Sequence, residues 1–319
     1  MLNIFYINVI ELNAKWGAER FVNRGFIANG HQTFTLDYRK YRSFLAKKFL
    51  EMQEDFDVVF LQRGDHFPAE LIEAVNRPRF FWASELVSRC RDHDALLKSG
   101  LFDHIFVHSK TCERTVIQMG WVKPEKVSTL INGFDPEVHH KIPGLKKDID
   151  ILHVGNISPR RRQILNSLSK SFKVEEHQVF GEAMVKSLNR AKIVLNIHTE
   201  DFLDTETRIF EALGCCSFVI TERLSEENPF TSGEHLVETN SLEEMQDMLS
   251  YYLKNDEERE RIAHMGNQEA MTNHTYNARA RYIAEVMGKY GVNIHKNSSP
   301  IDQLAVIRYW ERMLQLLQP

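Results

Sequence analysis

Short apolar runs alternate with amphipathic stretches along most of the 319 residues, and this alternation limits the fold more than any other feature. In the first half, apolar runs lie at residues 2–7, 33–36, 58–61, 80–83, 104–107 and 127–131. Amphipathic stretches at 17–28, 68–75 and 110–119 separate them. Strands that alternate with helices in this way predict βαβ units and a parallel sheet with helices on both faces.

A second series of the same kind begins near residue 149. Strands are expected at 149–154, 173–176, 193–197 and 216–221, and helices at 161–169, 181–190, 206–213, 242–254 and 256–272. Single domains rarely exceed about 250–300 residues, so a chain of this length predicts two domains. The expected fold is α/β, with two Rossmann-like domains facing across a cleft into which parallel strands point their carboxyl ends.

The expected domain boundaries follow from turn-forming residues. We expect an N-terminal domain at 1–142, a C-terminal domain at 149–290, and a linker rich in Pro, Gly and Lys at 139–148. A last helix is predicted at 300–319, after a cap and a proline. Its apolar residues repeat at helical spacing: Val306, Ile307, Trp310, Leu314 and Leu317. Because such a stripe needs a partner, we expect this helix to complete the N-terminal domain and to bury Trp310.

Composition excludes several classes of protein. Apolar residues make up 43% and charged residues 26%, which excludes a wholly disordered chain. The net charge of −4 argues against nucleic-acid binding over the whole surface of the protein. No apolar run approaches the roughly 20 residues that a membrane-spanning helix needs. The four cysteines form neither a CxxC pair nor a metal-binding spacing. A cytoplasmic, reducing location is therefore expected.

The segment at 204–214 carries the strongest chemical signal. It reads DTETRIFEALG and predicts a short helix that begins directly after a buried strand. A helix start carries free N–H groups and a partial positive charge, so it attracts an anion such as a phosphate. Arg208 adds a fork of donors, and Glu211 can accept two hydrogen bonds from the vicinal hydroxyls of a ribose. The alternative is an ordinary capped helix with an Arg/Glu surface pair.

This segment also resembles a known family. TETRIFEALGC is similar to the donor-site signature of GT-B fold glycosyltransferases of group 1, in particular the spore-maturation-protein (CgeB-like) group. Three further segments agree in order: DILHVGN before three arginines, LNRAKIVLNI before the donor loop, and INGFD at the end of the first half. The resemblance covers most of the chain and is strongest at 149–282. It implies a GT-B fold, with acceptor binding in the N-terminal domain and donor binding in the C-terminal domain.

The resemblance and the strand-end positions together assign candidate residues to the donor site. These are Gly155, Asn156, Arg160, Arg161, His198, Thr205, Glu206, Thr207, Arg208 and Glu211. The implied enzyme is a hexosyl- or pentosyltransferase that uses a nucleotide sugar, preferentially a UDP-sugar. It is expected to retain the anomeric configuration, to bind no metal and to need no cofactor, because arginines and helix dipoles stabilise the diphosphate.

Two departures from the family pattern weaken the acceptor side. Many retaining relatives carry two glutamates eight positions apart; Glu211 fits the second, but Leu203 occupies the first position. Where relatives have a Gly-Gly loop, this chain has Trp16-Gly17, preceded by Lys15. Where they have His-Asp after the fourth strand, it has Ser84-Glu85.

Three residues at predicted strand ends are candidate catalytic groups. Glu85 follows the strand at 80–83, and Asp65 with His66 follows the strand at 58–61, so all three are expected at the carboxyl edge of the first sheet. Two of them have a structural alternative: Glu85 as a helix cap, and His66 as a structural or exposed side chain. Lys15, Trp16 and Gly17 are expected to form the acceptor-side loop.

Three functions therefore stay open at this point. The first is transfer of a sugar from a nucleotide sugar to a glycan, a protein or a small molecule. The second is a catalytically silent nucleotide-binding or scaffold module, which the missing first glutamate favours. The third is a transferase acting on modified bases in DNA, for which the basic clusters at 39–42 and 47–48 would supply a groove. The oligomeric state does not follow from the sequence.

Overall fold

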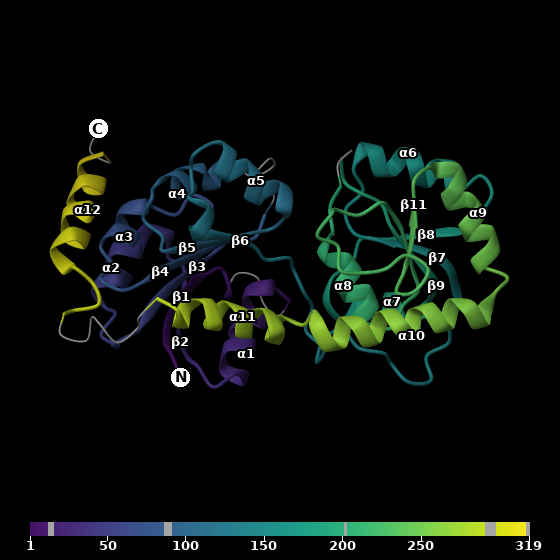
Figure 1. Cartoon of the computed structure of the whole chain (residues 1–319), viewed down its shortest axis with the longest axis horizontal. Helices are drawn as coiled ribbons and strands as arrows, with labels where there is room; N and C mark the ends of the chain where they lie inside the picture. The colour runs from purple at the N-terminus through teal and green to yellow at the C-terminus, as the bar shows by residue number, and fades with distance from the viewer. Residues whose placement is uncertain (12–15, 86–90, 201–202, 291–297, 317–319) are drawn as a thin grey trace. The chain divides into compact units, whose positions relative to one another are not determined.

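The computed structural model describes residues 1–11, 16–85, 91–200, 203–290 and 298–316. These form two compact units (Figure 1). The first comprises residues 1–131 and 277–319, and the second comprises residues 132–276. The chain thus crosses between the units twice, once after Ile131 and once after Tyr276.

The first unit is built on a parallel six-stranded sheet in the order β2-β1-β3-β4-β5-β6. Its strands are β1 (Asn3–Asn8), β2 (Gln32–Asp37), β3 (Val58–Gln62), β4 (Arg79–Ala83), β5 (His104–Val107) and β6 (Val127–Thr129). Its helices are α1 (Ala18–Ala28), α2 (Leu45–Leu50), α3 (Ala69–Glu73), α4 (Asp94–Lys98), α5 (Lys110–Gln118), α11 (Tyr276–Gly288) and α12 (Gln303–Leu316). Short 3₁₀ turns lie at Arg42–Phe44, Arg91–His93 and Pro124–Lys126. β3 is buried along its whole length, as expected for a central strand covered on both faces.

The second unit has a parallel five-stranded sheet in the order β11-β10-β9-β7-β8. Its strands are β7 (Ile149–Val154), β8 (Val174–His177), β9 (Ala191–Asn196), β10 (Val219–Glu222) and β11 (Val237–Thr239). Its helices are α6 (Pro159–Leu168), α7 (Gly181–Arg190), α8 (Thr207–Gly214), α9 (Leu242–Tyr252) and α10 (Asp256–Asn273). In Figure 1, α6 and α9 lie on one face of this sheet and α7, α8 and α10 on the other. The predicted α/β class with two Rossmann-like sheets is therefore confirmed.

The boundaries between the units differ from the expected positions at 142, 149 and 290. The stretch 139–148, which we interpreted as a linker, belongs to the second unit. The backbone N–H of Ile142 donates to Asn189 of α7 at 2.7 Å, and Lys147 donates to the carbonyl of Ala191 at 3.1 Å. These contacts arise from tertiary pairing, which turn-forming composition does not reveal.

The crossing segments are tied together inside the second unit. Phe134 forms a parallel bridge with Thr275, and the N–H of Tyr276 donates to the carbonyl of Phe134 at 2.9 Å. Phe134 is fully buried against α8, where a Cβ on Gly214 would approach its ring to 2.4 Å. Helix α8 therefore packs directly on the segment by which the chain first enters the second unit.

Helix α12 lies in the first unit beside α2 and α3 (Figure 1). Val306 is fully buried in that contact. Trp310, however, is 36% exposed, so the expectation that this side chain is buried is wrong. The helix contacts α2 and α3, and along it burial decreases from Val306 to the larger apolar side chains Trp310 and Leu314, which stay partly exposed. Leu317 lies outside the described residues.

Candidate functional site

The start of α8 is positioned by a buried loop. Asp204 and Thr205, which precede the helix, are 5% and 1% exposed, and Thr205 Oγ1 lies 2.6 Å from Ser225 Oγ. Glu206 is the N-cap residue in extended conformation, and its own side chain makes no capping hydrogen bond. The predicted helix therefore forms within this segment, at Thr207–Gly214, and its N-terminus presents the positive end of the helix dipole to an anion.

Arg208 and Glu211 lie on one face of α8 and contact each other. Arg208 Nη1 is 2.7 Å from Glu211 Oε2, and both side chains are 15% exposed. Arg208 Nη1 also contacts Met184 Sδ. His139, only 2% exposed, places Nε2 3.5 Å from Glu211 Oε1. Burial lowers the pKa of His139, although the neighbouring Glu211 carboxylate partly opposes this.

Arg161 joins three loops at the carboxyl edge of the second sheet. The side chain is 8% exposed and donates from Nε to the carbonyl of Ile197 at 2.7 Å and from Nη1 to the carbonyl of Asn156 at 3.0 Å. Its Nη2 contacts both carboxylate oxygens of Glu206, at 3.0 and 2.7 Å. Arg161 thus fixes the N-cap residue of α8 to the loops after β7 and β9.

Arg160, the preceding residue, likewise contacts a carboxylate and a backbone carbonyl at the same edge of the sheet. Its guanidinium contacts the Glu222 carboxylate at 2.8 and 2.5 Å and donates to the carbonyl of His198 at 3.1 Å. Burial alone would raise the pKa of Glu222, but hydrogen bonds from Arg160 and from the N–H of His198 outweigh it and lower that pKa. His198 Nε2 lies 2.8 Å from the carbonyl of Arg223, so this nitrogen carries the proton.

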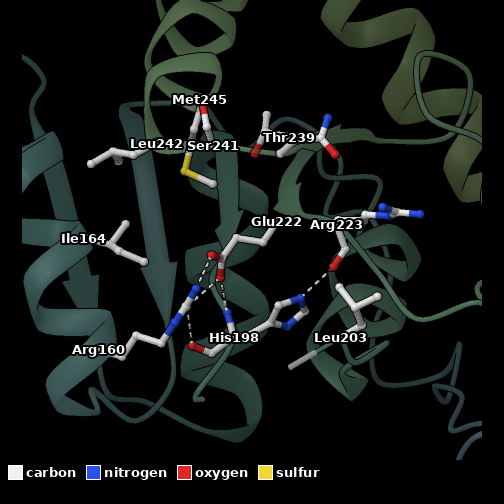
Figure 2. Close-up of a pocket in the computed structure, with 11 residues that line it drawn as sticks. Arg160, Ile164, His198, Leu203, Glu222, Arg223, Thr239, Ser241, Leu242 and Met245 are labelled. Atoms are coloured by element: carbon white, nitrogen blue, oxygen red, sulfur yellow. Dashed lines mark hydrogen bonds and ion pairs between the residues drawn. The ribbon is translucent and has the colours of Figure 1, made fainter. Parts of the chain in front are cut away.

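Arg160, His198 and Glu222, but not Arg208 or Glu211, line a pocket of about 660 Å³ in the second unit (Figure 2). It is lined by Arg160, Ile164, His198, Leu203, Glu222, Arg223, Thr239, Asn240, Ser241, Leu242 and Met245. Ile164, Leu242 and Met245 form an apolar side opposite the Arg160–Glu222 pair (Figure 2). The volume is that of a small-molecule site.

Gly155 directly follows β7 with a φ of 135°, and a Cβ built there would meet nothing within 4 Å. Its N–H donates to the carbonyl of His177 at 3.0 Å. The φ angle lies where side chains are disfavoured, so glycine serves the turn, and the open space permits close approach of a ligand.

In the first unit, Arg63, which directly follows β3, contacts three carboxylates, two of which were predicted as site residues. Its guanidinium lies 3.3 Å from Glu19, 3.7 Å from Asp65 and 3.3 Å from Glu85. Arg63 has a φ of 75°, unusual for a residue with a side chain. A non-glycine residue in this region costs about 1–3 kcal/mol and is often found at functional sites.

Asp65 and His66 have different surroundings. Asp65 accepts from the Tyr38 hydroxyl at 2.8 Å and from Arg39 Nη2 at 2.6 Å. Burial raises its pKa, but these hydrogen bonds prevail and lower it. The His66 imidazole is 57% exposed and lies 3.2 Å from Asp92. The structure thus brings Asp65 and Glu85 to Arg63, whereas His66 pairs elsewhere.

The predicted acceptor-side loop is described only in part. Trp16 is half-buried, and Gly17 is the N-cap residue of α1. Lys15 lies outside the described residues. Sequence reasoning missed Arg63, Glu222 and Arg223 as residues of these sites. Each directly follows or ends a parallel strand, so strand-end position was the signal that would have found them.

Metal-binding clusters and membrane-spanning helices are both absent from the described residues. No group of three or more His, Cys, Asp or Glu side chains there is arranged to hold a metal ion. None of the described helices combines the length and apolar character needed to cross a membrane.

Comparisons with known proteins identify the fold. Residues 145–285 match a family model described as glycosyl transferase-like. The chain is also similar to the solved structure of sucrose-phosphate synthase (tll1590) from Thermosynechococcus elongatus. That match has a TM-score of 0.65 and 12% identity, and covers 91% of this chain and 99% of the other. No curated protein sequence matches the chain.

Two further structures show the same fold. Alr3699/HepE from Anabaena, solved with UDP-glucose, matches with a TM-score of 0.65 and 12% identity over 91% of this chain and 100% of the other. AviGT4, a glycosyltransferase involved in avilamycin A biosynthesis, matches with a TM-score of 0.57 and 14% identity over 91% and 98%. The chain has the GT-B fold, and the resemblance to GT-B glycosyltransferases is confirmed. Nothing in these matches singles out the spore-maturation group.

Proposed function

We propose that this chain is a glycosyltransferase that moves a sugar from a nucleoside-diphosphate sugar to an acceptor. The observation that carries the proposal is the match of residues 145–285 to glycosyl transferase-like proteins, since the same region contains the open start of α8 with Arg208 and Glu211. A UDP-sugar is the preferred donor, because HepE was solved with UDP-glucose.

The donor-side roles follow from the contacts of α8. The first-turn N–H groups and Arg208 bind the diphosphate, which competes with Glu211 for the guanidinium. The carboxylate of Glu211 then accepts hydrogen bonds from the ribose hydroxyls. Gly155 lets the backbone after β7 approach the diphosphate. Thr205, Glu206 and Thr207 set the direction of the helix start.

Arg160 and Arg161 act differently from what the sequence suggested. Each already makes two contacts with a carboxylate, Glu222 or Glu206, and each also donates to a backbone carbonyl. Their role in the proposal is to hold the strand-end loops, including the one that contains His198. The diphosphate charge is met chiefly by Arg208 and the dipole of α8.

The first unit binds the acceptor in this proposal, through the loop at Trp16 and Gly17. Asp65 and Glu85 are candidate bases for the acceptor hydroxyl, since both carboxylates lie beside the Arg63 guanidinium. Transfer with retention, independence of metal, and a hexose or pentose as the sugar complete the proposal. The acceptor remains a glycan, a protein or a small molecule.

Release of nucleoside diphosphate from a panel of UDP-, GDP-, CDP-, ADP- and dTDP-sugars tests the proposal. We expect slow hydrolysis of one donor class without an acceptor. Arg208→Ala and Glu211→Gln should each weaken donor binding by about 1.5–3 kcal/mol, roughly 10- to 150-fold. Glu257→Gln, on the exposed first turn of α10, is the matched control and should leave donor use unchanged.

A catalytically silent module is the second candidate, favoured by Leu203 at the position of the first family glutamate. Leu203 is 50% exposed, and a leucine side chain cannot supply the carboxylate that the family glutamate would place there. Such a module would bind a nucleoside diphosphate and be stabilised by it, yet release none from any nucleotide sugar.

Modified DNA as acceptor has less support. Arg39 pairs with Asp65, Lys40 with Glu11, and both Lys47 and Lys48 with Glu51. These four cations share three carboxylates, which weakens their attraction for phosphates. A salt-dependent mobility shift on duplex DNA would restore this alternative.

A further inference from the structure

His139 lies beside Glu211 of α8 and is almost completely buried. Its side chain is 2% exposed, and Nε2 lies 3.5 Å from Glu211 Oε1. On the other side of the ring, Nδ1 lies 3.2 Å from the carbonyl oxygen of Asp135. A carbonyl oxygen only accepts, so Nδ1 carries the proton of the neutral ring and Nε2 keeps a bare lone pair. In the neutral form, two acceptors, Nε2 and Oε1, therefore face each other.

Arg208 supplies the charge that balances Glu211 in this arrangement. Its Nη1 lies 2.7 Å from Oε2, the carboxylate oxygen of Glu211 that does not face His139. Burial lowers the pKa of His139, and the charge of Arg208 also lowers it. Glu211 and the Asp135 carbonyl oppose this but do not outweigh it. The buried Cys215 thiol beside Glu211 stays uncharged, because burial raises its pKa. Without a donor, the site thus combines a paired Arg208 and Glu211 with a neutral His139.

We propose that His139 is a positioning residue that takes up a proton from solvent when the donor binds and then holds Glu211 in place. This role depends on the proposed function, in which the diphosphate draws Arg208 away from Glu211. That exchange leaves the carboxylate without its cation and adds the negative charge of the diphosphate nearby. Both changes favour the imidazolium form, whose Nε2–H donates to Oε1. The other oxygen, Oε2, is then presented to the ribose hydroxyls.

This coupling gives donor binding a defined pH dependence. A donor that raises the pKa of His139 binds more tightly at low pH, and the gain is lost as the pH rises through the raised pKa. One proton at most is taken up, so the affinity changes by no more than about tenfold per pH unit. We expect UDP-glucose to bind about threefold to tenfold more tightly at pH 6 than at pH 8. UDP-glucose is the suitable probe, because the terminal phosphate of free UDP itself titrates at about pH 6.

The first test needs no donor. Nuclear magnetic resonance titration of the histidine rings in the full chain gives the pKa of His139. Its resonance is assigned by its absence in His139→Gln or, should that variant misfold, by backbone-correlated spectra. Arg208→Gln removes the balancing cation, so the pKa of His139 should rise above its wild-type value. Adding Glu211→Gln should lower it again, because the carboxylate that stabilises the imidazolium is gone. An unchanged pKa in Arg208→Gln overturns the proposal.

Calorimetry with UDP-glucose is the second test. Binding enthalpies in buffers of different ionisation enthalpy give the number of protons taken up, and the wild-type chain should take up a measurable fraction of one proton near neutral pH. His139→Gln has an amide N–H that can donate to Glu211 without titrating. This variant should keep its affinity within about threefold and lose the proton uptake. His140→Gln, at the exposed neighbouring position, is the matched control and should take up protons as the wild-type chain does.

The two tests separate this role of His139 from the proposed function. A pKa that responds to Arg208→Gln in a chain that does not bind UDP-glucose supports the coupling and contradicts a UDP-sugar as donor. UDP-glucose binding without proton uptake, or with equal uptake in His139→Gln, overturns the role of His139 and leaves the donor site intact. Circular dichroism melts show whether each variant is folded.

Discussion

Removing the Arg161 guanidinium tests whether this buried side chain holds the donor helix in place. In Arg161→Met the stem is kept, but the Glu206 carboxylate and the carbonyls of Ile197 and Asn156 lose their donor. Breaking one partner of a buried ion pair costs about 3–5 kcal/mol, because the remaining charge stays in a poorly hydrated place. Folded domains have only about 5–15 kcal/mol of stability, so the loss should be large.

The neighbouring arginine supplies the control. Arg162 pairs with Glu176 at 2.8 Å, but its side chain is 46% exposed, and exposed pairs contribute about 0.2–1 kcal/mol. Arg162→Met changes the same residue type in the same helix, so any effect on helix propensity or net charge is matched. The two variants should differ by at least about 2 kcal/mol in the free energy of unfolding.

Urea unfolding at equilibrium can report the two units separately. The four tryptophans, at positions 16, 82, 121 and 310, all belong to the first unit. Tryptophan fluorescence therefore follows that unit, whereas far-ultraviolet circular dichroism follows both. We expect Arg161→Met to lower the midpoint of the circular dichroism transition assigned to the second unit much more than that of the fluorescence transition.

The double variant isolates the pair itself. Arg161→Met with Glu206→Gln removes both charges, so it should be more stable than Arg161→Met alone, as expected when an unpaired buried charge causes the loss. Equal destabilisation by Arg161→Met and Arg162→Met would refute the reasoning, because burial would then have no bearing on the cost.

Three further predictions concern packing, acid stability and metal. Gly214→Ala should destabilise the chain by about 1–3 kcal/mol, since its Cβ would meet the buried Phe134 ring at 2.4 Å. Gly288→Ala, with nothing within 4 Å, should be neutral or stabilising by up to about 1 kcal/mol; equal urea midpoints for the two variants would contradict the packing. Burial, with help from Arg161, lowers the pKa of His153 to about 4, so the unfolded chain alone takes up this proton between pH 6.5 and 4. Stability should fall by up to about 3 kcal/mol as the pH drops through this window, and less in His153→Leu; identical pH profiles would refute it. Donor hydrolysis should persist in EDTA, whereas loss of activity that Mg²⁺ or Mn²⁺ restores would show metal dependence.

The architecture could be predicted from the sequence because it rests on local periodicity. Residues 58–61 form a continuous apolar run, and the structure buries β3 on both faces, as a central parallel strand requires. The helix at 204–214 was predicted from its polar lead-in and its position after a buried strand. Both signals lie within a few residues of the element that they predict.

Charge pairing could not be predicted, because it joins residues distant in the chain. Arg160 and Arg161 looked available to bind a diphosphate, yet Glu222 and Glu206 lie 62 and 45 residues further along. Only the order of the strands brings those carboxylates to the same edge of the sheet. The pairing of Arg63 with Glu19, across 44 residues, arises in the same way.

The C-terminal helix shows both kinds of information. The sequence alone determined that residues after Pro300 form an amphipathic helix, because the period of apolar side chains is a local property. It did not determine which side of that helix would be covered. That depended on the surfaces of α2 and α3, which accept Val306 and leave Trp310 exposed, since burial is a property of the assembled fold and not of any one segment.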